Sequence, residues 1–380
     1  MKLTKFMCAA FAAMFALVGC NKDNIDDATS KNYKSVDIVI NNVKMGTKAG
    51  GTDAKLDGTK IQLNSLQIFF SDGENLYDAY DATNAPAVTY LEAAALSGLD
   101  ANMSMSFHFL PANVTEVLVV GNKAKITGVT TKAALNQTVE IDEYQDVTNL
   151  LLYAEAPLTA VEKDAHNNGS NAHLSNVYKA NLSIMPLVAR FEVENFSCDF
   201  ETGSTAKVVV DKMAFLNYFS QCDLMSANVV ADTEDTIDIT SQQAIYGYFQ
   251  DPVKMNKANW NNDYFDNDDA KHPVVELTAA NSSVDVNIAY NFFCNGAESP
   301  IHLLDIKHYE NTSAPGAPAY LWTNKYFKEN TSEQVTTFEP GKIYRLSFKF
   351  TEGNLKFQDK CVDITVSVAT WTVVRVTPGF

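Results

Sequence analysis

The sequence predicts an all-β protein with two β-sandwich domains in series. Past residue 35, many short segments show apolar alternation or enrichment in β-branched and aromatic residues, and Gly, Asn, Asp and Pro turns separate them. Helical periodicity is scarce, and only residues 89–97 and 131–135 are typical of short helices. At 380 residues, the chain exceeds what one hydrophobic core usually holds, so two domains are expected. The clearest predicted strands are residues 66–70, 103–109, 115–120, 206–213 and 344–350.

The chain begins with the features of an export signal. Lys2 and Lys5 precede an apolar run at residues 6–18, which is too short to span a membrane and is typical of a secretory signal peptide. Leu-Val-Gly-Cys at its end, with Cys20 as the last residue, is similar to the lipobox of bacterial lipoproteins. This resemblance implies that residues 1–19 are removed and that Cys20 carries the acyl chains of a lipid anchor. The alternative is an ordinary signal peptide in which Cys20 has no such role.

The mature chain is expected to be strongly acidic. The full sequence has 29 Lys and Arg against 46 Asp and Glu, a net charge of −17, and loss of the signal peptide with its two lysines takes this to −19. The charge argues against nucleic acid and anionic lipid headgroups as partners, because both require basic patches. No second apolar run reaches membrane-spanning length, so the lipid on Cys20 is the only membrane anchor that we expect.

Four cysteines remain besides Cys20 and Cys8, which leaves with the signal peptide. They allow three disulfide pairings in an exported protein, and the sequence does not select among them. Two of them lie in apolar, strand-like stretches, so buried free thiols are the alternative. No two have the close spacing of a zinc site. The four are Cys198, Cys222, Cys294 and Cys361.

The usual catalytic and metal-binding motifs are missing from the sequence. It has no G-x-S-x-G, no H-E-x-x-H, no Walker loop and no G-x-G-x-x-G. His166 and His173 share a polar loop without a third ligand, and the aspartates within residues 263–269 lack the glycine and glutamate of an EF-hand loop. We therefore expect a protein that is not an enzyme and has no metal or cofactor, although a Ser-His-Asp site that assembles only in the fold is not excluded by sequence.

The first predicted strand after the signal peptide has one apolar face, formed by Val36, Ile38 and Ile40. If proteolysis removed this strand, it would expose unpaired main-chain groups and apolar pockets. An open edge of this kind is a place where another chain adds a strand. We therefore expect residues 36–40 to form a displaceable strand.

The strand leads into residues 43–52, which place Lys48 among Gly, Thr and Ala. Such a segment is typical of a hairpin loop, since glycine supplies the conformations that turns need. A flexible, exposed segment is also what a protease requires. We expect a protease to cut between Lys48 and Ala49, which would remove a propeptide at residues 20–48.

The chain ends in a long apolar strand within residues 361–380. A single strand of about 17 residues would extend about 55 Å, about three times the length of a usual sandwich strand. It is therefore expected either to split near residues 369–371 or to leave its own domain with its last part. In the second case residues 370–380 would be a donor strand for the groove of another copy, a head-to-tail contact that builds filaments. Its two faces carry Val374, Val376 and Phe380 on one side and Trp371 and Val373 on the other.

The domain boundary is expected near Met185. Residues 158–176 are polar and typical of a long loop, and the strand pattern that resumes at residues 180–194 contains Pro186, a natural break. The expected segments are the signal peptide at 1–19, the propeptide at 20–48, and sandwich domains at 49–185 and 186–380.

Several motifs are spread over nearly the whole chain besides the lipobox at Cys20. They are Leu-Gln-Ile-Phe-Phe-Ser-Asp-Gly at residues 66–73, Phe-Leu-Pro-Ala-Asn-Val-Thr at 109–115, Val-Val-Gly-Asn at 119–122, Met-Pro-Leu-Val-Ala-Arg-Phe-Glu-Val at 185–193, Phe-Glu-Pro-Gly-Lys-Ile-Tyr-Arg-Leu at 338–346, and Val-Ser-Val-Ala-Thr-Trp-Thr-Val-Val at 366–374. In this order and spacing the chain resembles the fimbrillins of Bacteroidales, the type V pilin subunits.

The resemblance implies two transthyretin-like β-sandwich domains and export as a lipoprotein to the outer membrane. It also implies that a trypsin-like protease removes the N-terminal segment outside the cell. The C-terminal strand of one subunit would then enter the groove of the next. The partners that it implies are other fimbrial subunits and, in adhesion, a host or bacterial receptor.

One position departs from the family pattern. The family's cut usually follows an arginine, whereas the candidate here is Lys48, and guanidinium and ammonium groups are not interchangeable in a specific pocket. Either the protease accepts lysine or the subunit stays uncut, as a lipid-bound anchor of the fibre would. The alternative from another class is a glycan-binding surface lipoprotein, in which Trp260, Tyr264 and Trp322 would stack on sugars.

Overall fold

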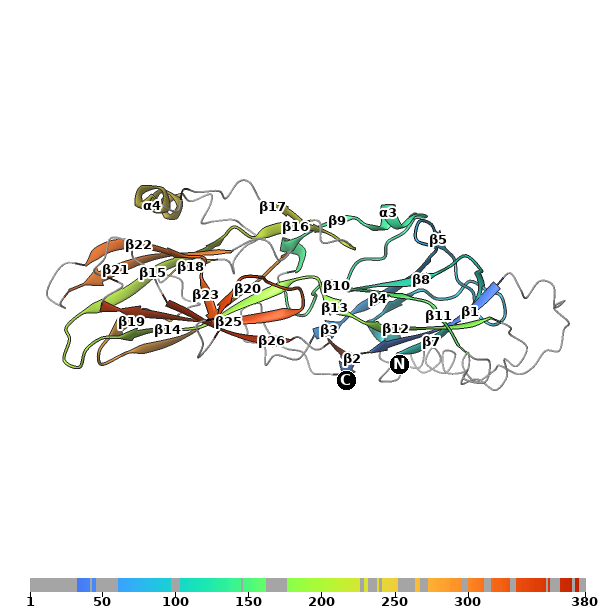
Figure 1. Ribbon diagram of the computed structural model, residues 1–380, viewed down its shortest axis with the longest axis horizontal. Coiled ribbons are helices and arrows are strands. Elements are labelled where there is room, and N and C mark those ends of the chain that lie inside the picture. Colours follow the sequence, from blue (N-terminus) through green and yellow to red (C-terminus); the bar gives the residue numbers. More distant parts are fainter. Residues whose placement is uncertain are drawn as a thin grey trace, which may run out of the picture. The chain divides into compact units, whose positions relative to one another are not determined.

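The structure is a computed structural model in which the chain divides into two compact units (Figure 1). The first unit takes the described residues within Met1–Val43, Ser65–Leu135 and Ala154–Ile184, and the second takes those within Lys44–Asn64, Asn136–Tyr153 and Met185–Phe380. The structure describes residues 33–41, 43–45, 61–96, 103–144, 146–161, 176–225, 229–231, 238, 241–251, 264–266, 273–294, 300–310, 316–328, 333–352, 355, 363–370 and 373–375.

The two units are interleaved along the chain. The last segment of the second unit starts at Met185, where the sequence places the domain boundary. Residues 136–153, however, group with the second unit although they precede that boundary. The division into consecutive domains at 49–185 and 186–380 stays a prediction.

Two sheets contain the described strands of the first unit, and one of them also includes β13, whose residues belong to the second unit. One sheet has the order β11-β12-β1-β7, and the other has the order β13-β10-β8-β4-β5, with β6 also paired to β4. The short helices α2 (Ala93–Leu96) and α3 (Lys132–Leu135) lie within the two segments with helical periodicity. The strands are β1 (Tyr33–Asn41), β4 (Ser65–Ser71), β5 (Leu76–Tyr77), β6 (Tyr90–Glu92), β7 (Ser104–Pro111), β8 (Glu116–Gly121), β10 (Leu152–Pro157), β11 (Thr159–Ala160), β12 (Val177–Ser183) and β13 (Met185–Pro186).

The core of the first unit lies between its two sheets. Phe70 of β4 and Phe107 of β7 are both buried, and their rings meet edge to face with centroids 5.0 Å apart. Since β4 and β7 belong to different sheets, this contact joins the sheets face to face. Alternate residues of each strand therefore point into a shared apolar layer, as in a β-sandwich.

The second unit also contains two large sheets. One has the order β20-β14-β25-β26-β23-β24, and the other has the order β18-β15-β21-β22, with β19 also paired to β15. The prediction of an all-β fold is confirmed. The strands are β14 (Ala189–Asp199), β15 (Lys207–Leu216), β18 (Tyr264–Asp266), β19 (Val275–Thr278), β20 (Ser283–Phe292), β21 (Ile301–Tyr309), β22 (Ala317–Thr323), β23 (Tyr326–Lys328), β24 (Gln334–Val335), β25 (Lys342–Thr351) and β26 (Asp363–Thr370).

Two three-stranded sheets complete the second unit. One has the order β17-β16-β9, formed by Val229–Ala231, Phe219–Asp223 and Thr138–Glu140. The other has the order β2-β27-β3, formed by Val43–Met45, Val373–Arg375 and Ile61–Leu63. The 3-10 helix η2 (Ile141–Tyr144) follows β9.

Aromatic side chains fill the core of the second unit. Phe191 of β14 stacks on Phe292 of β20 at 4.6 Å, and it meets Phe215 of β15 edge to face at 5.1 Å. Because β14 and β15 belong to different sheets, these rings join the two layers. Aromatic pairs of this kind add to the burial of their large apolar surfaces.

A fully buried histidine lies within this aromatic core. His302 Nδ1 is 2.9 Å from the Tyr326 hydroxyl, and its Nε2 is hydrogen-bonded to the Tyr290 hydroxyl. The Tyr326 hydroxyl donates to the carbonyl of Pro300 at 2.8 Å, so it accepts from His302 Nδ1–H, and Nε2 accepts from Tyr290. Every polar atom of the neutral ring therefore has a partner, and burial lowers the pKa of His302 to about 3.

A second buried polar network joins β14 to η2. Arg190 Nε donates to Glu192 at 3.0 Å, and Arg190 Nη1 donates to the amide oxygen of Asn291 at 3.1 Å. The Asn291 amide in turn donates to the carbonyl of Tyr144 at 2.8 Å, while Arg345 Nε donates to the other oxygen of Glu192 at 3.1 Å. The network fixes η2 against β20 through groups that are nearly all shielded from water.

The helix α4 (Gln242–Gln250) was not predicted from the sequence. The side chain of its N-cap, Ser241, accepts a hydrogen bond from the amide of Ala244. Ile245, Tyr248 and Phe249, which share one helix face, pack on β21 and β22. Gly247 within the helix and the shortness of the segment hide this periodicity in the sequence.

Candidate functional site

Strand β1 lies in the interior of its sheet, between β12 and β7 (Figure 1). It runs parallel to β12, with Ser35 opposite Val177 and Asn41 opposite Ser183. It runs antiparallel to β7, with a register shift between Lys34 and Val36. Both edges of β1 are therefore paired, although β12 lies more than 130 residues away in sequence.

The apolar face of β1 is fully buried. Val36, Ile38 and Ile40 are each 0% exposed. Ile38 is opposite Ala180 on one side and Met105 on the other, and both are buried. The predicted alternation of this strand is thus confirmed in its burial, and the strand contributes three side chains to the core of the first unit.

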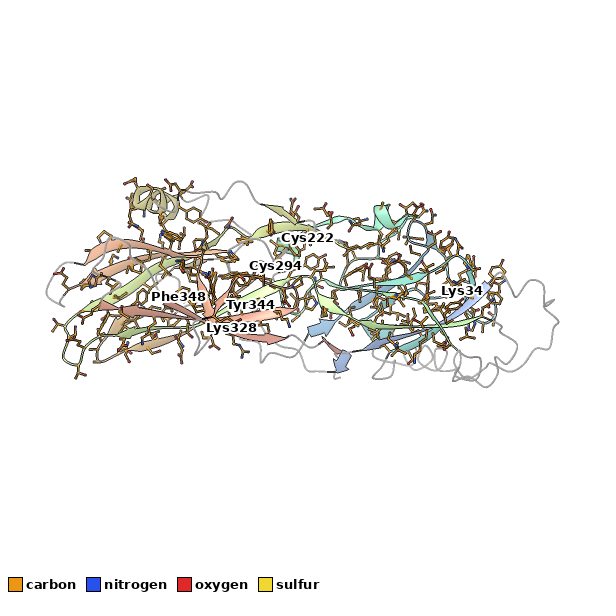
Figure 2. The ribbon with its side chains drawn as sticks, viewed as in Figure 1. Lys34, Cys222, Cys294, Lys328, Tyr344 and Phe348 are labelled. Carbon is orange, nitrogen blue, oxygen red and sulfur yellow. The ribbon has the colours of Figure 1, made fainter. Side chains whose placement is uncertain are left out.

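Polar contacts hold the beginning of β1 in place. Lys34 Nζ donates to the carbonyl of Val114 at 2.6 Å and lies 4.4 Å from the centre of the Tyr178 ring (Figure 2). Burial lowers the pKa of Lys34. Ser35 Oγ is 3.1 Å from His108 Nδ1, and both side chains are buried. The partners in these contacts are 73 or more residues apart in sequence, so no local sequence pattern predicts the contacts.

Three further contacts bind the strand at its beginning and on its polar face. Ser106 Oγ donates to the carboxylate of Asp37 at 2.6 Å. The amide of Ser35 donates to the carbonyl of Asn176 at 3.0 Å, while the Asn176 side chain donates to the carbonyl of Tyr33 at 3.3 Å. The strand is therefore attached by its main chain, its buried face and its polar face.

Burial of the apolar face of β1 contributes a free energy that is comparable to the stability of a whole domain. Burying a Val or Ile side chain contributes about 1.5 to 3 kcal/mol, so the three residues contribute about 5 to 9 kcal/mol. A whole domain is stable by about 5 to 15 kcal/mol. Removal of β1 would leave β7 and β12 with facing, unpaired edges and three empty apolar positions between them, a groove of the shape of one strand.

The C-terminal segment is split into two strands. β26 ends at Thr370 and pairs antiparallel with β25 and parallel with β23, so it is an interior strand of its own sheet. β27 begins at Val373 and pairs in parallel with β3, with Val373 opposite Ile61 and Val374 opposite Gln62. The break lies beside the expected one at residues 369–371. The last strand belongs to another sheet than β26.

The remaining predicted site residues lie outside the described residues. These are the lipidation site Cys20, the cut site Lys48 and Ala49, and the donor residues Trp371, Val376 and Phe380. Their roles stay predictions.

The cysteines that the structure describes are free thiols. Cys198 and Cys222 are buried, and Cys294 is partly buried. Figure 2 labels Cys222 and Cys294. Burial raises the pKa of Cys222 and of Cys294 to about 12, so both are protonated at neutral pH. Thiols in this state are poor nucleophiles. Cys361 lies outside the described residues.

The described residues contain no group of three or more His, Cys, Asp or Glu side chains that could hold a metal ion. In the same part of the chain, no helix combines the length and apolar character needed to cross a membrane. Of the aromatic residues considered for glycan stacking, Trp322 is partly buried against the cluster beneath α4. The side chains of Trp260 and Tyr264 lie outside the described set.

No protein-family model matches the chain, and no curated protein matches it. Solved structures, in contrast, do match the chain. A fimbrilin (FimA) from Porphyromonas gingivalis W83 is 12% identical with a TM-score of 0.52, and the match covers 91% of this chain and 99% of that one. A candidate cell adhesion protein from Parabacteroides distasonis ATCC 8503 is 15% identical with a TM-score of 0.53, over 90% of this chain and 98% of that one. The resemblance to Bacteroidales fimbrillins is thereby confirmed at the level of the fold.

Proposed function

We propose that the chain is a structural subunit of a fimbrium and not an enzyme. It is exported as a lipoprotein precursor with Cys20 as its lipid anchor in the outer membrane. A trypsin-like protease cuts between Lys48 and Ala49 and thereby removes β1. The C-terminal strand of a neighbouring subunit then fills the groove, and repetition of this step builds an extracellular fibre that supports adhesion to a host or bacterial receptor.

The position of β1 carries this proposal. An interior strand with three fully buried side chains directly precedes the lysine of the expected cut, and only residues 42–47 separate the two. A strand so placed is part of the core while attached and leaves a strand-shaped groove when lost. The apolar C-terminal segment has the alternation that such a groove accepts.

Brief trypsin treatment of the purified precursor tests the proposal. N-terminal sequencing should find Ala49, and the trimmed protein should form ladders of polymers that resist mild denaturants. Lys48→Gln should stay monomeric because its cut site is lost, whereas the matched variant Lys44→Gln should assemble normally. A truncation that lacks residues 371–380 should be cut but remain monomeric, since only the donor is missing.

Several outcomes would contradict the proposal. If the truncated protein still formed ladders of polymers, residues 371–380 would not be the donor strand. If the subunits of native fibres began far from residue 49, Lys48 would not be the cut site. Subunits that retain Cys20 in native fibres would identify the chain as the uncut anchor instead.

A further inference from the structure

The C-terminal strand β27 is held between two strands from the N-terminal part of the chain. In the sheet of order β2-β27-β3, it is the central strand. β27 is parallel to β3, with Arg375 opposite Leu63. As the central strand of this short sheet, it has a neighbour at each of its two main-chain edges.

The two neighbours of β27 lie on opposite sides of the expected cut. β2 ends at Met45, three residues before Lys48, and β3 begins at Ile61. β2 is also continuous with β1, because only Asn42 separates Asn41 from Val43. A cut after Lys48 therefore leaves β1 and β2 together on one fragment and β3 on the body of the protein.

We propose that β2 is a retaining strand, which keeps β27 paired within its own subunit until the propeptide leaves. The inference rests on the proposed function, and it adds that one cut controls both partners of the assembly step. Departure of the fragment opens the groove between β7 and β12 through loss of β1. It also opens one edge of β27 through loss of β2.

The sizes of the strands fit this role. After loss of β2, β27 is paired only with β3, and each of these strands has three residues. A pair of strands this short is marginal in water. β2 itself is equally short, but its covalent link to the well-buried β1 keeps it at a high local concentration beside β27. In the uncut protein neither the groove nor the C-terminal strand is then available to another copy.

Hydrogen exchange of the uncut precursor tests the retaining strand directly. Successive amides of a strand point to opposite sides, so only one of Lys44 and Met45 directs its N–H toward β27. The variants Lys44→Pro and Met45→Pro therefore form a matched pair, since proline is tolerated where an edge N–H faces solvent. One of the two should speed exchange in β27 at least about fivefold, the effect of one lost main-chain hydrogen bond. The other should leave it unchanged.

The amides of β7 and β12 report in the same experiment whether β1 stays in place, and they should not change. Equal exchange of β27 in the wild type and both variants would overturn the proposal. Equal acceleration in both variants would also overturn it, because it would show general loosening rather than loss of a specific pairing.

A binding experiment separates failure of this inference from failure of the proposed function. The acceptor is trypsin-trimmed protein that ends at Thr370 and so cannot donate. The uncut proline variant that frees β27 should bind this acceptor at least about fivefold faster than uncut wild type, in proportion to its exposed donor. Equal rates for these two donors would overturn the retaining strand. If trimmed full-length protein also fails to bind the acceptor, strand exchange itself is wrong.

Discussion

Truncation of Ile38 measures how strongly β1 is held. The side chain is 0% exposed and is opposite Ala180 and Met105 on its two neighbouring strands. Replacement of a buried Ile by Ala costs about 2 to 5 kcal/mol, and replacement by Val costs about 0.5 to 1.5 kcal/mol. Ile38→Val and Ile38→Ala should therefore lower the stability of the first unit in two graded steps.

Hydrogen exchange is the suitable assay because the two units need not unfold together. The free energy of opening should fall at the amides of β7 and β12 in the first unit. The amides of β14 in the second unit serve as an internal reference and should not change. Val39→Ala, on the opposite and only partly buried face of β1, is the matched control and should cost less than Ile38→Ala.

The variant Ile38→Ala should also change the rate at which the cut fragment leaves the groove. If the loss of about 2 kcal/mol or more appears in the dissociation rate, the cut fragment should leave the groove at least about 30-fold faster in Ile38→Ala than in the wild type. Size-exclusion chromatography of labelled fragment measures this rate. A change below about 0.5 kcal/mol in Ile38→Ala, or equal effects of Ile38→Ala and Val39→Ala, would refute the assignment of β1 as the core strand of a groove.

Two further predictions concern the buried polar groups of the second unit. The folded pKa of His302 is about 3, against about 6.5 for an unfolded chain, so the unfolded state binds more protons between these values and stability falls as pH falls. From pH 7 to pH 5 the wild type should lose about 2 kcal/mol more than His302→Phe, as measured by urea unfolding read through exchange of β21; equal losses would contradict the buried neutral ring. Glu192→Gln should cost about 3 to 5 kcal/mol in the same assay, because it leaves the buried Arg190 without this carboxylate. Arg190→Met should cost less, since Glu192 keeps Arg345 at 3.1 Å, and the reverse order would show that the network is organised differently.

The strand pattern of the fold was accessible from the sequence because alternation is local. Val36, Ile38 and Ile40 show their shared face within five residues, and the structure buries all three. The length of the C-terminal segment likewise indicated a break, which lies between Thr370 and Val373. Both inferences need only the geometry of a single strand.

The partners of these strands were not accessible in the same way. The neighbours of β1 are β7 and β12, and pairing between distant segments leaves no signal in one sequence. The contact of Ser35 with His108 and the burial of His302 are invisible for the same reason. The placement of β27 between β2 and β3 likewise depends on pairing between segments that are about 300 residues apart in sequence, Val373–Arg375 with Val43–Met45 and Ile61–Leu63.

The opposite senses of pairing around β1 give the groove a direction. β12 is parallel to β1 and β7 is antiparallel to it, and the two ladders space their hydrogen bonds differently. A replacement strand that entered reversed would present the wrong ladder to both walls. The bulge of β7 between Phe107 and Leu110, which lies opposite Val36 and Lys34 in the uncut protein, would also meet the wrong end of that strand. If subunits join through this groove as proposed, all of them would point the same way. The resulting fibre would then have two unlike ends, only one of which could grow by accepting a new strand.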